Sequence, residues 1–298
     1  MRCWYRAMAE RWTPGGALDP RVNLLRPGPD GQPSVAAQAD QGRVCEVADP
    51  AAPLRHAPSP DAPLDTEALK GERVTVYETS DEGWAWGQLD ADGYVGFVPA
   101  AALRDPGSPP THKVSVLRTL VFPGPSIKLP PIEGLSLGCR LAVARDQPPF
   151  AVTSTGGYVP ARHLVPIDSY ENDFVAVAER FLGAPYLWGG KSNLGLDCSA
   201  LVQLALTACG VPCPRDSDMQ EHALGTLIAS DFSALRRGDL LFWKGHVAIV
   251  RDPATLIHAN AFHMAAVSEP MSQAIGRLRA DGNEPTSVRR LERPTQLG

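Results

Sequence analysis

Apolar and polar residues alternate along the chain between about residues 42 and 105, and this pattern predicts short β-strands. Residues 73–78 (RVTVYE) and 84–89 (WAWGQL) alternate, and after the turn 90–93 (DADG) comes 94–99 (YVGFVP). Alternation places every second side chain on the same face of a sheet, and Gly and Asp favour the tight turns that join short strands. We therefore predict a small β-barrel over residues 42–105.

A second stretch, residues 110–167, resembles the first. The run Gly93-Tyr94 followed by Val98-Pro99 has a counterpart in residues 157–160 (GYVP). Pro99 and Pro160 are separated by the same number of positions as Leu103 and Leu164. Repetition at a fixed offset is typical of tandem domains, and it predicts a second small barrel over 110–167.

The ends of the chain follow different patterns. Residues 1–41 are rich in Pro, Gly and Ala with weak periodicity, which predicts an extended arm or linker. Apolar residues recur at helical spacing over 174–182, and again in a segment that starts at Asp197 and ends at Gly210. These two segments predict helices on either side of a Gly-rich loop.

Three short apolar runs follow the helices, at 239–243, 246–250 and 256–260. They predict an antiparallel meander, and helices followed by strands favour an α+β domain. The fold class expected for the chain is therefore α+β, with two small β-barrels ahead of the mixed domain. The predicted division is an arm at 1–41, barrels at 42–105 and 110–167, and an α+β domain at 168–298.

Charge and hydropathy exclude several classes of partner. The chain has 28 basic and 33 acidic residues, a net charge of −5, which gives no basis for binding nucleic acid or an anionic membrane. No apolar run approaches the roughly 18–20 residues that a membrane helix needs. Whether translation starts at Met1 or at Met8, no apolar h-region follows, so we expect no export signal.

The six cysteines are scattered, with no dense framework and no CxxC pair. Cys209 and Cys213 lie four positions apart, but no second ligand pair follows, so we expect no zinc site and no other metal or cofactor. Reduced thiols fit best, and together with the missing export signal they predict a cytoplasmic protein. The sequence does not indicate the oligomeric state.

Cys198 is the candidate nucleophile. Asp197 is a favourable N-cap residue, which places Cys198 at the first position of a helix. The helix dipole and the unpaired N–H groups there favour an anion, so we expect the pKa of the thiol to be lowered. A buried, inert cysteine is the common alternative, but a helix N-terminus beside a Gly-rich loop is an unusual place for deep core.

A cysteine nucleophile needs a base, and two histidines are suitably spaced. His246 opens one predicted strand and His258 lies in the next. If the strands pair around the turn at 252–253, both imidazoles face the same side. One can then pair with Cys198 while the other orients it. Each histidine alone is more often structural, but the combination predicts a catalytic Cys–His–His triad.

Four segments carry a resemblance to a known family: 183–203 (GAPYLWGGKSNLGLDCSALVQ), 214–220 (PRDSDMQ), 238–250 (GDLLFWKGHVAIV) and 256–260 (LIHAN). They resemble, in order, the motifs of the NlpC family of papain-like cysteine peptidases of bacterial cell-wall peptides. The resemblance covers about residues 168–298 and implies that Cys198, His246 and His258 are the triad. One departure is Ala200, where the family usually has Gly; we expect activity to survive it.

The resemblance also implies a substrate. With two upstream SH3-like barrels, the arrangement is similar to γ-D-glutamyl-L-diamino acid endopeptidases, which cut L-Ala-γ-D-Glu-diaminopimelate and require a free N-terminal L-Ala. It implies that one end of the substrate is held by residues of the catalytic domain and by a Tyr of the first barrel, with Glu72 as a weaker candidate. The implied substrate-binding residues are Tyr186, Asp197, Ser199, Asp216, Ser217 and Tyr94.

Simpler interpretations of these residues stay open. Asp197 could serve only as an N-cap, and Tyr186 could pack or donate to an oxyanion instead of touching the amine. Arg215 could pair with Asp216 or Asp218 without contacting substrate. His263 shows no partner in the sequence and is expected at the surface, as is His222.

The function expected from these observations is a cysteine endopeptidase that hydrolyses the γ-D-glutamyl–diamino acid bond of murein tripeptides during cell-wall peptide recycling. The main alternative is a secreted wall-remodelling hydrolase whose SH3-like domains bind the wall; it needs an export signal. A wall-peptide binding module without activity would predict a broken triad, yet all three side chains are present. Acyl transfer instead of hydrolysis also remains open.

Overall fold

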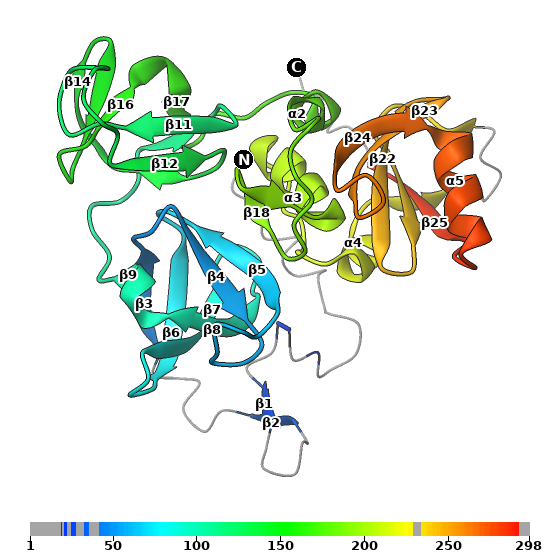
Figure 1. Cartoon of the computed structure of the whole chain (residues 1–298), viewed down its shortest axis with the longest axis horizontal. Coiled ribbons are helices and arrows are strands. Elements are labelled where there is room, and N and C mark those ends of the chain that lie inside the picture. The colour runs from blue at the N-terminus through cyan, green and yellow to red at the C-terminus, as the bar shows by residue number, and fades with distance from the viewer. Residues whose placement is uncertain are drawn as a thin grey trace. The chain divides into compact units, whose positions relative to one another are not determined.

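The computed structural model describes residues 42–228 and 234–291, with Asp19, Arg21, Val22 and two short paired strands, β1 (Leu25–Pro27) and β2 (Pro33–Val35). Most of the predicted arm at 1–41 lies outside the described residues. The chain forms two compact units (Figure 1). The β unit comprises Gly16–Tyr170 and Trp188–Gly195, and the α+β unit comprises Glu171–Leu187 and the residues from Leu196 onward.

The first part of the β unit is one antiparallel sheet in the order β5-β4-β8-β7-β6-β3-β9. Alternating residues such as Ala52 and Leu54, or Val74 and Val76, point into a common core. The three strands predicted at 73–78, 84–89 and 94–99 are confirmed as β6, β7 and β8. The bounds are β3 (Arg43–Val47), β4 (Ala51–Arg55), β5 (Leu64–Leu69), β6 (Arg73–Thr79), β7 (Trp84–Leu89), β8 (Val95–Pro99) and β9 (Leu103–Arg104).

The second part of the β unit is built from shorter strands in three small sheets, β13-β10-β17, β11-β12 and β14-β15-β16. Phe150 packs edge-on against both Phe122 and Tyr158, with ring centroids 6.1 Å apart in each pair. The bounds are β10 (His112–Val114), β11 (Arg118–Val121), β12 (Glu133–Ser136), β13 (Arg140–Leu141), β14 (Val143–Gln147), β15 (Phe150–Thr153), β16 (Tyr158–Pro160) and β17 (Leu164–Pro166).

The two parts share one local structure at the positions that the sequence matched. In each, a strand ends in proline, a single 3₁₀ turn follows, and a leucine resumes the extended conformation. The turns are η2 (Ala100–Ala102) and η3 (Ala161–His163), and the leucines are Leu103 (φ −112°) and Leu164 (φ −116°). The recurrence supports a relationship between the two stretches.

The α+β unit contains a six-stranded sheet in the order β20-β25-β21-β22-β23-β24. The predicted meander is confirmed as β21 (Asp239–Trp243), β22 (His246–Asp252) and β23 (Thr255–Asn260), joined as antiparallel neighbours. The sequence did not predict the strands on either side of this meander, β20 (Thr226–Ile228), β24 (Ala265–Pro270) and β25 (Pro285–Arg290), or the helices α4 (Ser217–Ala223) and α5 (Met271–Ala280).

Helices pack against this sheet and position the site. Helix α3 (Cys198–Ala208) contacts β22 and β23, while α5 contacts β24 (Figure 1). Met271 and Ala274 of α5 join a core with buried residues of β21, β22 and β23. Helix α2 (Phe174–Arg180) starts at the N-cap Asp173, whose carboxylate accepts from the Val175 N–H at 2.9 Å.

The segment 188–195 lies within the range predicted for the C-terminal domain, and its contacts group it with the β unit. The Lys191 N–H donates to Glu67 at 2.7 Å, and the Lys191 ammonium lies 3.3 Å from a Glu72 carboxylate oxygen. The strand β18 (Lys191–Ser192) pairs with β19 (Gly195–Leu196), where the chain returns to the α+β unit. Within the described residues, no helix is long and apolar enough to cross a membrane.

Candidate functional site

Cys198 is the first residue of α3, as the sequence predicted. Asp197 is the N-cap, and its Oδ1 accepts a hydrogen bond from the Ala200 N–H at 2.8 Å. This bond satisfies one of the unpaired donors of the first helical turn. Ala200 is fully buried, so the methyl group that replaces the expected Gly is accommodated without loss of the cap.

The prediction that the thiol pKa is lowered is wrong for this structure. Cys198 is only 7% exposed, and burial raises its pKa to about 12. The neighbouring Asp197 carboxylate contributes to this raised pKa, while a hydrogen bond from the Val247 backbone and the Arg215 charge oppose it. Removal of the thiolate from water outweighs the helix N-terminus. Cys198 is therefore a thiol at neutral pH unless a base takes its proton.

His246 and His258 lie together, from the neighbouring strands β22 and β23. His246 Nε2 is 2.8 Å from His258 Nδ1, and the ring centroids are 5.0 Å apart. The Trp243 ring lies beside His246, with centroids 5.6 Å apart. Burial, followed by the neighbouring His258, lowers the pKa of His246 to about 3. His246 is thus a neutral imidazole at neutral pH, as a proton acceptor must be.

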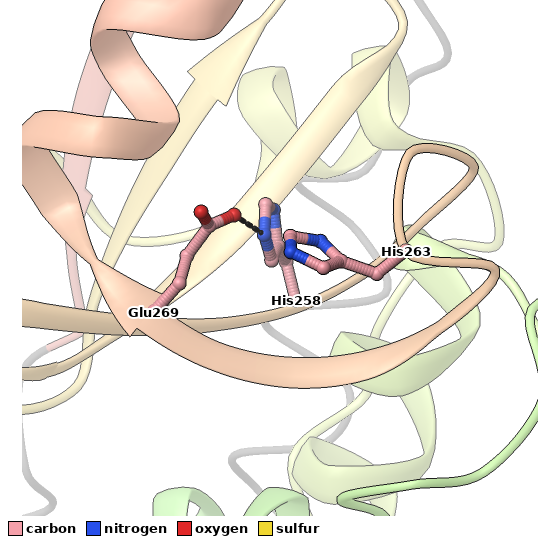
Figure 2. Close-up of side chains that lie close together, drawn as sticks. All are labelled: His258, His263 and Glu269. Carbon is pink, nitrogen blue, oxygen red and sulfur yellow. Dashed lines mark hydrogen bonds and ion pairs between the residues drawn. The ribbon is translucent and has the colours of Figure 1, made fainter.

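Two residues that the sequence did not single out complete this cluster. Glu269 on β24 lies with Oε1 2.6 Å from His258 Nε2, a contact visible in Figure 2. Arg277 on α5 donates to both Glu269 oxygens, at 2.9 Å and 2.6 Å. Burial alone would raise the pKa of Glu269, but the hydrogen bonds from Arg277 and His258 lower it to about 2. Neither β24 nor α5 showed a sequence pattern that would have placed them here.

Asp197 has a second partner besides the helix. Arg215, only 1% exposed, donates to Asp197 Oδ1 at 2.9 Å and to Oδ2 at 2.7 Å. It also donates to Ser199 Oγ at 2.9 Å, and Ser199 Oγ donates to Asp197 Oδ1 at 3.2 Å. The sequence offered Asp216 or Asp218 as the partner of Arg215; the structure contains an ion pair of Arg215 with Asp197, which the sequence did not propose. The Asp197 charge is therefore balanced inside the protein.

Tyr186 lies within electrostatic reach of the nucleophile. Burial, together with the nearby Cys198 and Asp197, raises its pKa to about 12. Its backbone N–H donates to the Met264 carbonyl at 3.0 Å, which ties it to the start of β24. The half-buried phenol stays protonated at neutral pH and can donate a hydrogen bond near the thiol.

For the other predicted substrate-binding residues, the structure gives the position in the fold and the degree of burial. Asp216 and Ser217 are half-buried at the start of α4. Tyr94 is 5% exposed and lies in the core of the first part of the β unit, a structural role that the sequence did not separate from substrate binding. Its contact with substrate stays a prediction. Glu72 is buried and paired with Lys191, so its charge is balanced within the β unit.

One group of side chains has the composition of a metal site. His258, His263 and Glu269 place one ligand atom each within 4.8 Å of one another (Figure 2). His263 is exposed, as predicted, but its Nδ1 lies 3.0 Å from Asn260 Oδ1. Both Glu269 oxygens are held by the Arg277 guanidinium, and a cation at that carboxylate opposes a second one. The arrangement therefore fits a hydrogen-bonded relay better than a cation site.

Comparison with known proteins gives two family matches. The model described as NlpC/P60 family matches residues 183–277, which include the cysteine and both histidines. The model described as bacterial dipeptidyl-peptidase Sh3 domain matches residues 54–103, which span most of the first sheet. The NlpC/P60 match lies mainly in the α+β unit, and the Sh3 domain match lies in the first part of the β unit.

Two curated relatives share a name. The γ-D-glutamyl-L-lysine dipeptidyl-peptidase of Bacillus subtilis is 30% identical over 221 residues, covering 67% of this chain and 73% of that protein. The protein of the same name from Bacillus cereus is 27% identical over 228 residues, covering 66% and 67%. A crystal structure of an NlpC/P60 family protein from Bacillus cereus matches with a TM-score of 0.71 at 22% identity, covering 84% of this chain and all of that chain.

Proposed function

Because the chain belongs to the NlpC/P60 family and is a cysteine peptidase of cell-wall peptides, we propose that Cys198, His246 and His258 are its catalytic triad. The observation that carries this assignment is the position of Cys198. It begins α3, and its sulfur accepts a hydrogen bond from the backbone of Val247, the residue after His246. His246 in turn contacts His258 at 2.8 Å. A nucleophile, a base and a residue that orients the base are the parts that thiol catalysis needs.

The resting pair is neutral, so the proton moves as the bond forms. His246 accepts the Cys198 proton while the sulfur attacks the substrate carbonyl carbon. The carbonyl oxygen becomes an oxyanion, which the Cys198 backbone N–H and the Tyr186 hydroxyl stabilise. His246 then gives the proton to the leaving amine, and the C–N bond breaks. Water hydrolyses the resulting thioester and regenerates the thiol.

We propose that the substrate is a murein peptide with a free N-terminal L-Ala, cut between D-Glu and the diamino acid. The names of two relatives support a γ-D-glutamyl bond. Because Arg215 already balances Asp197, the substrate ammonium needs further oxygen acceptors. We assign that role to Ser199, Asp216 and Ser217, with Tyr186 beside them.

Two broader assignments belong to the same proposal. Residues 110–167 form a second SH3-like domain, supported by the turn and leucine that both parts of the β unit share. The enzyme acts in the cytoplasm on free peptides released during wall recycling, a compartment in which its scattered cysteines would stay reduced.

The test compares free L-Ala-γ-D-Glu-diaminopimelate with the same peptide blocked at its amine by a muramyl group. The free peptide should release L-Ala-D-Glu, and blocking should lower kcat/KM by at least about 100-fold, because a site built for a polar group rejects an analogue that lacks it. The Cys198→Ala variant, which should fold normally, is the control and should show no turnover.

The outcomes separate the alternatives. Equal or faster cutting of the blocked peptide would replace recycling by remodelling of intact wall. Turnover by Cys198→Ala would contradict the triad, and failure of the wild type to cut either peptide would contradict the substrate assignment.

A further inference from the structure

We propose that Glu269 and Arg277 are positioning residues that determine which nitrogen of each catalytic histidine carries the proton. The inference rests on the proposed triad and extends it by two residues. It starts from a chain of contacts that runs from α5 through β24 and β23 to His246 on β22.

The Glu269 carboxylate can only accept hydrogen bonds from its neighbours. Arg277 donates to both of its oxygens, and Phe262 lies under the guanidinium with its ring centroid 4.3 Å away. This bidentate pair is well shielded, because Glu269 is only 6% exposed. A carboxylate held in this way stays ionised through the neutral range and offers only lone pairs to a neighbour.

The second step carries this constraint to His258. Glu269 Oε1 lies 2.6 Å from His258 Nε2, so that nitrogen must hold a proton. Burial lowers the pKa of His258, which keeps the ring neutral with one proton only. His258 Nδ1 is therefore an acceptor. It lies 2.8 Å from His246 Nε2, which must then be the donor.

The third step reaches the thiol. With its proton on Nε2, neutral His246 has an unprotonated Nδ1, the nitrogen that can accept the Cys198 proton. If Glu269 did not require an N–H, His258 could instead carry its proton on Nδ1 and donate to His246 Nε2. His246 would then be protonated on Nδ1 and could not act as a base, the kind of error that a wrong tautomer causes in other triads.

The proton balance leaves Glu269 unchanged. The Cys198 proton moves to His246 and then to the leaving amine, so neither His258 nor Glu269 gains or loses a proton in the cycle. While His246 is an imidazolium, the Glu269 charge acts on it through His258 at a distance of two hydrogen bonds. Glu269 thus orients the base and partly balances its transient charge without contacting substrate.

The experiment uses the full chain carrying Glu269→Gln, which keeps the side-chain shape but presents both an acceptor and a donor to His258. We expect kcat to fall at least about tenfold, with the roughly 10⁴-fold of a wrong tautomer as the upper bound, and KM to change little. In ¹⁵N spectra of histidine, the wild type should show a protonated Nε2 on His258 and on His246. The variant should show both tautomers.

Asp239→Asn is the matched control. Asp239 is 1% exposed and accepts from Arg290 at two atoms, both at 2.7 Å, in the same sheet but outside the histidine cluster. It should lower stability without changing kcat or the histidine nitrogen signals. Glu269→Asp, which keeps an acceptor-only carboxylate, should restore the single tautomer and part of kcat.

Arg277→Met provides a second approach if Glu269→Gln does not fold. Without Arg277, the pKa of Glu269 should rise, and protonated Glu269 could donate to His258. The acid limb of kcat/KM should therefore move to higher pH. An unmoved acid limb, or wild-type nitrogen signals in Glu269→Gln, would overturn the inference. Because the spectra need no substrate, that failure is distinct from a wild type that cuts no peptide, which would overturn the proposed function.

Discussion

At the scale of single residues, the nucleophile depends on its base more than on its helix. Cys198 begins α3, where the dipole favours a thiolate, yet burial raises its pKa to about 12. His246 has its pKa lowered to about 3 by burial and by His258. Both shifts disfavour charge, so the pair rests as thiol and imidazole. The ion pair forms only as bonding to substrate or reagent begins.

This predicts how Cys198 reacts with iodoacetamide. In His246→Ala, the rate of alkylation of Cys198 at pH 7 should fall by about 10²- to 10⁴-fold, because no general base remains. Mass spectrometry of the Cys198 peptide across a pH series measures this rate. The half-buried Cys209 in the same samples is the internal control and should react equally in both proteins. A Cys198 thiolate that titrates below pH 7 in His246→Ala would contradict the argument.

Among the residues of the site, side-chain chemistry in the sequence predicted the proposed triad but not Glu269, which contacts His258, or Arg277, which pairs with Glu269. A cysteine after an N-cap aspartate and two histidines twelve positions apart were enough to propose the triad. The pKa of Cys198 was predicted in the wrong direction because burial, which the sequence does not reveal, outweighs the dipole. Glu269 and Arg277 were missed because their role depends on the pairing of β24 with β23.

At the scale of elements, alternation predicted the strands with strong patterns and missed the weakly patterned ones. β6, β7 and β8 alternate clearly, and β21, β22 and β23 are nearly continuous apolar runs. β24 (AAVSEP) and β25 (PTSVRR) carry few large apolar residues. They are stabilised by neighbouring strands, which is information that a single segment of sequence does not contain.

The segment 188–195 shows a similar limit, since no local pattern assigns it to the β unit. Gly189 has φ +73°, and a Cβ there would lie 2.3 Å from the Leu64 carbonyl oxygen. Two requirements thus select glycine: a left-handed backbone and close approach to β5. The contacts of Lys191 with Glu67 and Glu72 hold the rest of the segment on the same surface.

We predict that Gly189→Ala destabilises the protein by about 2–4 kcal/mol, since backbone strain of about 1–3 kcal/mol adds to a steric clash. Gly183→Ala is the matched control. Gly183 also has a positive φ, +86°, but a Cβ there meets nothing within 4 Å. It should cost only about 1–2 kcal/mol. Urea unfolding of the three proteins measures the difference, and equal losses would show that the Leu64 contact is unimportant.

At the scale of the whole molecule, the chain leaves the α+β unit for a short segment between two residues of the candidate site. It leaves the α+β unit after Leu187, one residue beyond Tyr186, and returns at Leu196, two residues before Cys198. The segment between them is fixed by buried carboxylates of the β unit. The composition, with its ordinary charge and hydropathy, predicted neither this excursion nor the way that catalytic side chains respond to burial.

The global stability should record the protonation states of the catalytic histidines. The pKa of His246 is about 3 in the folded protein and near 6.5 in the unfolded chain. Between these values the unfolded state binds the extra proton, so the free energy of unfolding rises with pH. The contribution of neutral His246 to the free energy of unfolding is therefore complete above pH 6.5 and decreases as the pH falls below 6.5. Lowered pKa values at His258 and Glu269 act in the same direction.

We predict that His246→Gln reduces the pH dependence of stability between pH 6.5 and pH 5 by up to about 1.4 kcal/mol per pH unit, the slope of one proton. Glutamine can keep a hydrogen bond to His258 but does not titrate. Urea unfolding at half-unit steps from pH 5 to pH 8 measures the slopes. Above pH 7 the histidine is neutral in both states, so wild type and variant should run parallel there. Parallel curves below pH 6.5 as well would mean that His246 takes up its proton at the same pH in the folded and unfolded states, and the lowered pKa would be wrong. A pKa of His246 raised in the folded state would instead make the curves diverge above pH 6.5, with the stability of the wild type falling as the pH rises.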